Sequence, residues 1–144
     1  MAGQKSQKGA NNIVMKRKIY QQLLDWKKNR NGEVALLVEG ARRIGKSYIV
    51  EEFARNEYES YIFIDFNKAP QMVRDWFDRY LEDLDTLFLY LSQHYKVRLH
   101  ERKSLIILDE IQLCPRARAA IKFLVADRRY DYIETGSLVS IKKN

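Results

Sequence analysis

The stretch that decides the fold of this chain is Val38-Glu39-Gly40-Ala41-Arg42-Arg43-Ile44-Gly45-Lys46-Ser47. It contains Gly-x-x-x-x-Gly-Lys-Ser directly after the apolar run of residues 34–38, which is typical of a buried strand. Backbone N–H groups of such a loop converge on a phosphate, and the next helix presents its positive end to the same charge. Lys46 is then expected to reach the β- and γ-phosphates, and the Ser47 hydroxyl to ligate Mg²⁺. The alternative, a glycine-punctuated turn followed by a chance Lys-Ser, is disfavoured because a strand precedes the motif and an amphipathic helix follows it.

A second motif places two carboxylates, Asp109 and Glu110, at the end of the apolar strand 105–108. Ligands of open parallel α/β sheets bind at that edge. We expect Asp109 to hold Mg²⁺ together with Ser47, because Mg²⁺ takes one or two carboxylates beside phosphate oxygens and waters. Glu110 is then placed to orient and deprotonate a water that attacks the γ-phosphate. The alternative, an Asp-Glu pair that only caps the next helix, is disfavoured because a predicted phosphate loop lies about sixty residues upstream.

The rest of the chain alternates strands with helices. Helices are predicted over 15–28, about 45–55, from Pro70 to about 80, 84–95 and about 116–125, and strands over 34–38, 61–66, 105–108 and 132–135. The run 105–108 is continuously apolar and is therefore expected to be a central, parallel strand. This order predicts an α/β fold of the three-layer type, with a mostly parallel sheet between two layers of helices.

Composition and charge limit the function classes. The net charge is +7, and residues 1–31 carry all of it, with eight basic side chains and one acid. A basic arm of this kind can contact phosphate backbones without reading sequence, so nucleic-acid binding by residues 1–31 stays open beside the simpler interpretation of a solvated tail and helix face. No apolar run reaches the roughly 18 residues of a membrane helix, so no membrane partner is expected. Cys114 is the only cysteine, which fits a reducing cytoplasm.

The three motifs in this order resemble an AAA+-type ATPase, and more closely a group of prokaryotic ATPases with Gly-Ala-Arg-x-x-Gly-Lys-[Ser/Thr], Asp-Glu-Ile-Gln and Thr-Gly-Ser. They stand here as residues 40–47, 109–112 and 135–137, within a resemblance that covers about 15–140. It implies a P-loop NTPase fold, ATP and Mg²⁺ as cofactors, and a polar residue, Thr135 or Ser137, that faces the γ-phosphate. Thr-Gly-Ser is also ordinary turn chemistry, so the role of the third motif rests on its order and position. The nucleotide-binding residues expected are Gly40, Ala41, Arg42, Arg43, Ile44, Gly45, Lys46, Ser47 and Tyr48.

The chain departs from the family pattern at its end. The sequence stops at Asn144, whereas members of the family continue with a fifth strand, a helical lid and a further domain. We therefore expect a disordered basic tail over 1–14 and an incomplete ATPase core over 15–144, truncated after the fourth strand. The fifth strand would flank the phosphate-loop strand, which is then an unpaired edge that invites self-association. Four arginines are candidates for a finger that acts on a neighbouring subunit: Arg116, Arg118, Arg128 and Arg129.

Three functions compete. The first is an Mg²⁺-dependent ATPase that drives a conformational change in a partner. The second is a nucleotide-binding module with little or no turnover, because the lid is missing. The third is a small-molecule phosphotransferase, which is weaker because a second carboxylate beside Asp109 suits the activation of water.

Overall fold

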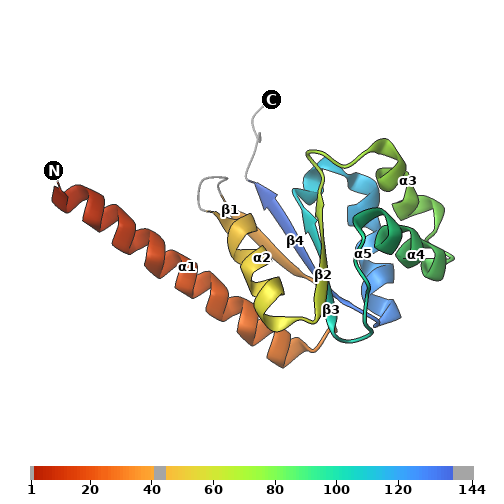
Figure 1. The fold of residues 1–144 in the computed structure, drawn as a ribbon, viewed down its shortest axis with the longest axis horizontal. Helices are drawn as coiled ribbons and strands as arrows, with labels where there is room; N and C mark the ends of the chain where they lie inside the picture. The colour runs from red at the N-terminus through yellow and green to blue at the C-terminus, as the bar shows by residue number, and fades with distance from the viewer. Residues whose placement is uncertain (1, 41–44, 138–144) are drawn as a thin grey trace.

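A parallel four-stranded sheet forms the centre of the molecule in the computed structural model, which describes the backbone of residues 2–40 and 45–137 and the side chains of residues 9–40 and 45–137. Within these ranges the strands are β1 (Leu36–Gly40), β2 (Ser60–Asp65), β3 (Ser104–Asp109) and β4 (Asp131–Ser137). They lie in the order β1-β4-β3-β2, and every pair is parallel (Figure 1). All six residues of β3 are buried, as expected for the apolar run in the middle of the sheet.

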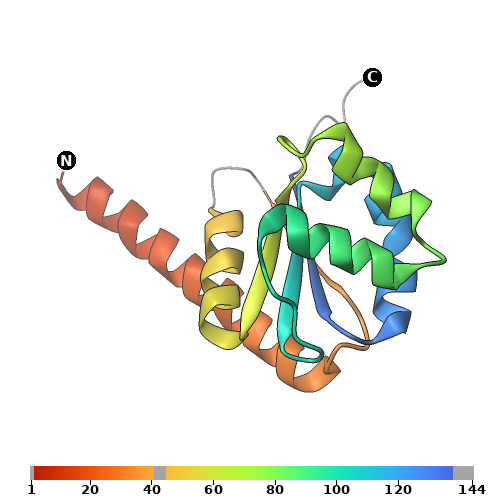
Figure 2. The ribbon, with the colours of Figure 1, turned by 45° about the vertical axis from the view of Figure 1, so that its right-hand side comes forward.

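Helices cover both faces of this sheet. One face packs against α1 (Ala2–Arg30) and α2 (Lys46–Glu57), and the other against α3 (Gln71–Arg79), α4 (Leu84–Tyr95) and α5 (Pro115–Asp127) (Figures 1 and 2). Each face of the sheet has its own hydrophobic core. Successive side chains of β3 point into these two cores alternately, because the side chains of a strand alternate between opposite faces. Leu105 and Ile107 join the core under α1 and α2, whereas Ile106 and Leu108 join the core under α3, α4 and α5. The three-layer α/β fold predicted from the sequence is therefore confirmed.

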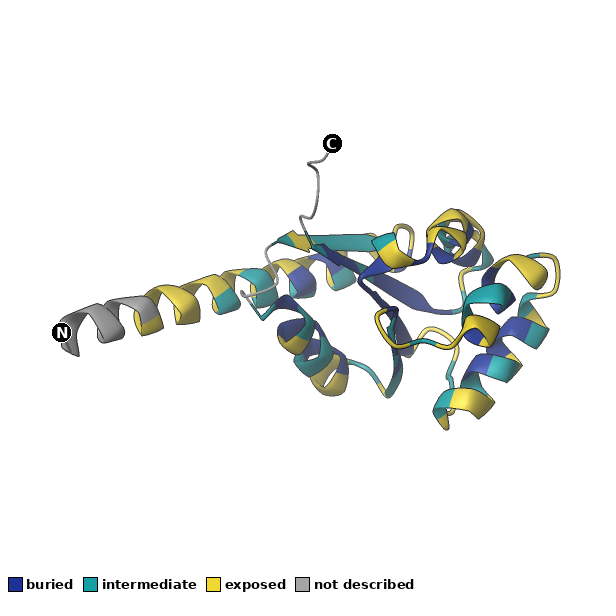
Figure 3. Ribbon diagram, turned by 90° about the horizontal axis from the view of Figure 1, so that it is seen from above, coloured by how far each residue is buried: buried dark blue, intermediate teal, exposed yellow. Residues whose placement is uncertain are grey.

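The first helix is longer than predicted. It begins at Ala2, so residues 9–14 are helical where a disordered tail over 1–14 was expected. Its C-terminal half packs through Leu23 and Trp26, whereas Ile13, Val14 and Met15 are 45–62% exposed (Figure 3). A helix that is already nucleated adds residues at little further cost, and residues 9–14 therefore continue the helix without burying a face of their own.

Strand β1 lies at the edge of the sheet. In the described part of the chain it pairs with β4 alone, which agrees with the unpaired edge expected for the strand before the phosphate loop. Each strand lies within about two residues of its predicted bounds, and α4 has the bounds predicted for it. Among the helices described, none is long and apolar enough to cross a membrane.

Candidate functional site

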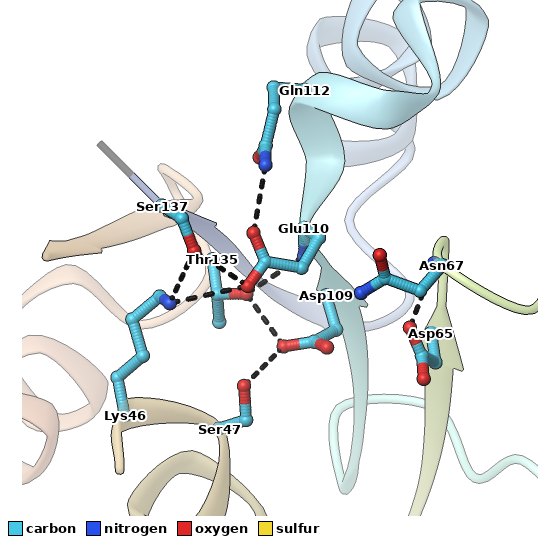
Figure 4. Close-up of polar contacts among 9 residues, drawn as sticks. All are labelled: Lys46, Ser47, Asp65, Asn67, Asp109, Glu110, Gln112, Thr135 and Ser137. Carbon is cyan, nitrogen blue, oxygen red and sulfur yellow. Dashed lines mark hydrogen bonds and ion pairs between the residues drawn. The ribbon is translucent and has the colours of Figure 1, made fainter. Parts of the chain in front are cut away.

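The candidate site lies where the carboxyl ends of β3 and β4 meet the first turn of α2 (Figure 4). Gly45 precedes this turn and adopts a left-handed conformation with φ 73°, which costs glycine little and other residues more. Because α2 begins immediately after it, Lys46 and Ser47 both point from the helix N-terminus toward the ends of β3 and β4.

The ammonium group of Lys46 is the central charge of the site. The residue is 2% exposed, and its Nζ lies 3.3 Å from Oε2 of Glu110 and 3.1 Å from Oγ of Ser137. Ser137 in turn donates to the same Glu110 oxygen at 2.9 Å. A buried ammonium needs a nearby partner of this kind, since an unpaired charge in the interior is strongly disfavoured.

Asp109 is held by two hydroxyl groups. Its Oδ1 accepts from Ser47 Oγ at 2.6 Å and from Thr135 Oγ1 at 2.7 Å. Burial raises the pKa of Asp109 above its ordinary value; the hydrogen bonds from Ser47 and Thr135 oppose this rise, and the charges of Glu110 and Asp65 add to it. Asp65 contributes because it ends β2 directly beside Asp109 in the sheet register.

Glu110 occupies an unusual backbone conformation. Its φ of 56° and ψ of 52° are left-handed, a conformation that is rare for residues other than Gly, Asn and Asp. The Glu110 N–H donates to Thr135 Oγ1 at 2.9 Å, and Oε1 accepts from Gln112 Nε2 at 2.8 Å. Burial raises the pKa of Glu110, but the hydrogen bonds from Gln112 and Ser137 and the nearby Lys46 outweigh it, so that the pKa lies below its ordinary value.

The structure brings six predicted site residues into one hydrogen-bonded cluster, listed here in chain order: Lys46, Ser47, Asp109, Glu110, Thr135 and Ser137. Gly40 ends β1 beside the loop, and Ala41, Arg42, Arg43 and Ile44 lie outside the described residues. Tyr48 is 62% exposed, and Nζ of Lys16 in α1 lies 5.8 Å from the centre of its ring. This contact brings α1 to the start of α2.

The four finger candidates lie on α5 and just after it. Arg116 is near the start of α5 and pairs with Asp75 and Asp78 of α3. Arg129 follows the end of the helix, at the opposite edge of the sheet, and pairs with Asp85 and Asp127. Arg118 is exposed near the start of α5, and Arg128 is exposed at its C-cap. Of the four, Arg116 and Arg118 lie at the end of α5 that follows β3 and its carboxylates, and Arg128 and Arg129 at the far end.

Gln112 is the polar residue of this cluster to which sequence reasoning gave no role. It stands two residues after Glu110, in the 3₁₀ helix η2 (Ile111–Leu113), and its amide nitrogen donates to that carboxylate. Its presence in the Asp-Glu-Ile-Gln motif was the available signal. The spacing alone does not show that the chain turns back at this point.

The oxygen atoms present fit a magnesium site. Ser47 Oγ and Asp109 Oδ1 lie 2.6 Å apart between the start of α2 and the end of β3, and hard oxygen donors are the ligands that Mg²⁺ prefers. No cluster of three or more His, Cys, Asp or Glu side chains suited to a metal occurs among the described residues. One carboxylate and one hydroxyl match a cation that keeps several waters and takes its other ligands from phosphate.

Comparison with known proteins gives a family match over most of the chain. A family model described as "AAA domain" matches residues 32–144. Among solved structures, one titled "Structure of C. elegans PCH-2" is similar with a TM-score of 0.42 and 15% sequence identity, over 91% of this chain and 36% of that chain. The chain thus spans about a third of the length of that protein. No curated protein matches the sequence.

Proposed function

The chain belongs to the AAA domain family of ATPase-type nucleotide-binding proteins, and from this premise we propose that it binds ATP with Mg²⁺ at residues 40–47 and hydrolyses it. The observation that carries the proposal is the buried ammonium of Lys46, held 3.3 Å from Glu110 at the start of α2. Phosphate oxygens entering the loop can replace the carboxylate as the partner of this cation. Helix α2 adds its positive end to the same place.

The metal site in this proposal consists of Ser47 and Asp109, with the remaining ligands from phosphate and water. When bound, Mg²⁺ neutralises charge that develops on the phosphate oxygens. The hydroxyl of Thr135 keeps the Asp109 carboxylate and the Glu110 backbone in a fixed relation, since it donates to one and accepts from the other. Ser47 and Thr135 both hold Oδ1 of Asp109, which leaves Oδ2 to face the metal or its waters.

Glu110 is the general base of the proposed reaction. The water oxygen attacks the γ-phosphorus, its proton passes to Glu110, and the bond from that phosphorus to the β–γ bridging oxygen breaks. The pKa of Glu110 lies below its ordinary value, so that the group is ionised and able to accept the proton at neutral pH. Lys46 and Ser137 both donate hydrogen bonds to this carboxylate in the structure, and both side chains must move as phosphate enters.

The first experiment compares Glu110→Gln with the control Glu59→Gln, which changes an exposed glutamate. Removal of a general base should lower the rate of phosphate release by about 10²-fold or more, since such groups contribute 10²–10⁴-fold. The dissociation constant for ATP should stay within about threefold of the wild-type value. Unchanged turnover in Glu110→Gln would remove Glu110 from this role.

The second experiment tests binding itself through Lys46→Ala, with Lys122→Ala as a control on the exposed face of α5. Loss of a charge-assisted contact of about 1.5–3 kcal/mol should weaken ATP binding roughly tenfold or more. Isothermal titration calorimetry measures this constant directly. Equal affinity in Lys46→Ala and the wild type would contradict nucleotide binding at this loop.

A second candidate function, nucleotide binding with little turnover, is favoured by the full occupation of the Glu110 carboxylate. Oε1 and Oε2 already accept hydrogen bonds from Gln112, Ser137 and Lys46. A nucleotide at a hundredfold excess over its dissociation constant stabilises the protein by about 2.7 kcal/mol. A thermal shift of this origin without phosphate release would select the binding module. In both cases we propose that the bound nucleotide changes the conformation of a protein partner.

A further inference from the structure

The two oxygens of the Glu110 carboxylate have different partners. Oε2 is shared by Lys46 at 3.3 Å, from the start of α2 on the side of residues 40–47, and by Ser137 at 2.9 Å, from the end of β4. Oε1 accepts from Nε2 of Gln112 at 2.8 Å, on the side of η2 (Figure 4). The loop side and the helix side of the carboxylate are therefore held separately.

The backbone places Gln112 for this contact. Glu110 is left-handed and caps η2, so that the chain reverses and the side chain two residues later returns to the carboxylate. Orientation of the amide follows from chemistry, because its nitrogen donates to a carboxylate whereas its oxygen would repel one. Oε1 of Gln112 is buried without a hydrogen-bond partner in the described residues, so this side chain is kept in place at the cost of an unsatisfied acceptor.

Gly136 provides the room that Gln112 needs. A Cβ atom built on this glycine would lie 3.3 Å from Oε1 of Gln112, and within the described residues no other atom outside its chain neighbours comes within 4 Å. That distance is tighter than ordinary contact, so a side chain at residue 136 would press on the amide. The glycine of the Thr-Gly-Ser motif thus connects the tip of β4 to the residue that holds Glu110.

We propose that Gln112 is the positioning residue of this site: it fixes Oε1 of Glu110, so that Oε2 stays in place to receive the proton of the attacking water once phosphate draws Lys46 away. This inference rests on the proposed function. A neutral amide suits the role, because it holds the carboxylate without adding a full positive charge to it. Ser137 and Lys46 cannot replace it, since both bind the oxygen that must be freed.

The test measures ATP turnover and ATP affinity in Gln112→Ala, with Gln93→Ala, on the exposed side of α4, as the matched control. A misplaced base should lower kcat about tenfold, a fraction of the 10²–10⁴ that a general base supplies. KM, the dissociation constant for a non-hydrolysable ATP analogue and the melting temperature should stay close to wild type. Turnover equal to that of the wild type, or a loss that weaker binding or unfolding accounts for, would overturn the proposal.

A double-mutant cycle with Gly136→Ala separates positioning from a general structural effect. Gly136→Ala alone should lower kcat, because its methyl group displaces the Gln112 amide. In the Gln112→Ala background the same change should have little further effect, since the clashing group is absent. Additive losses would contradict the proposal, because they would mean that Gly136 acts without Gln112.

Failure of the proposed hydrolysis is distinguishable from failure of this inference. If the wild type binds nucleotide but shows no turnover above Glu110→Gln, hydrolysis is wrong, and hydrogen exchange at the Gln112 side-chain amide decides whether Gln112 holds the Glu110 carboxylate. With the ATP analogue bound, slow exchange relative to Gln93 supports it, and exchange as fast as that of Gln93 overturns it. A wild-type protein that binds no nucleotide would overturn both.

Discussion

At the scale of single residues, Asp109 is the proposed magnesium ligand, and its buried carboxylate also lowers the stability of the metal-free fold. It is 5% exposed and its pKa is raised chiefly by burial. A carboxyl whose pKa is higher in the folded than in the unfolded protein binds its proton more tightly when folded, so its ionisation destabilises the fold. This penalty is fully present at neutral pH, decreases as the pH falls through the folded pKa, and vanishes below the unfolded value. The metal, when bound, compensates for it.

Asp109→Asn should therefore raise the melting temperature of the metal-free protein at pH 7.5, because the amide keeps an oxygen for Ser47 and Thr135 without the buried charge. The gain should shrink as the pH approaches 4. Differential scanning fluorimetry in the presence of a chelator measures the melting temperature at each pH. The same variant should lose the additional stabilisation that Mg²⁺ gives with ATP. A lower melting temperature at both pH values would contradict the assigned cause of the pKa shift.

Gly45 permits a second prediction at this scale. Its φ of 73° is left-handed, and an alanine there should destabilise the protein by roughly 1–2 kcal/mol. Gly9→Ala is the matched control. It lies within α1, and no described atom outside its own helix turn comes within 4 Å of its added Cβ. A glycine-to-alanine change inside a helix is favourable by roughly 0.5–1 kcal/mol. Chemical denaturation should give opposite signs for the two variants; the same sign for both would argue against strain at the loop.

At the scale of elements, α1 consists of two parts with different roles. Its C-terminal half buries Leu23 and Trp26 against α2 and the sheet, and the Trp26 indole also donates to the Val34 carbonyl at 3.0 Å. The stretch around Ile13 to Met15 remains exposed. Leu23→Ala should cost about 2–5 kcal/mol, the usual range for a buried leucine.

Removal of residues 1–14, in contrast, should leave the free energy of unfolding nearly unchanged. Urea denaturation of both variants measures the difference. The same truncation should lower affinity for DNA if the N-terminal basic side chains bind it. Large destabilisation by the truncation would show that the exposed half of α1 has a partner.

The elements also show what the sequence could predict. Asp109 was expected at the ligand-binding edge of the sheet because it follows a buried parallel strand, and the family resemblance placed Thr135 or Ser137 near the γ-phosphate. In the structure β3 and β4 are neighbours, and Thr135 donates to Asp109. The contact of Gln112 with Glu110 depends on a left-handed backbone at Glu110, and no propensity rule predicts that conformation for glutamate. The long helix α1 was missed because residues 9–14 bury nothing, and an exposed helix has no apolar period to detect.

At the scale of the whole molecule, the sheet is asymmetric. β2 is the edge that the chain reaches first after α2, whereas β1, at the other edge, has β4 as its partner on one side in the described part of the chain. A cavity of about 710 Å³ lies between the start of β1 and α5, with Val34, Ala35, Ile121 and Val125 among its lining residues. The same cavity is also lined by the charged residues Glu33, Arg118, Lys122 and Glu134. Open backbone groups at a sheet edge favour pairing with another chain.

We therefore expect the protein to self-associate through the β1 edge. Light scattering after size-exclusion chromatography should give a mass that rises with concentration. Val34→Lys should lower that mass, because Val34 is 38% exposed beside this edge and a lysine there repels a second strand without a core cost. Leu89→Lys is the control, on an exposed site of α4 on the far side of the α3–α5 layer. A monomer at every concentration, or equal effects of the two lysines, would contradict association through β1. In that case β1 is stable without a second chain at its edge.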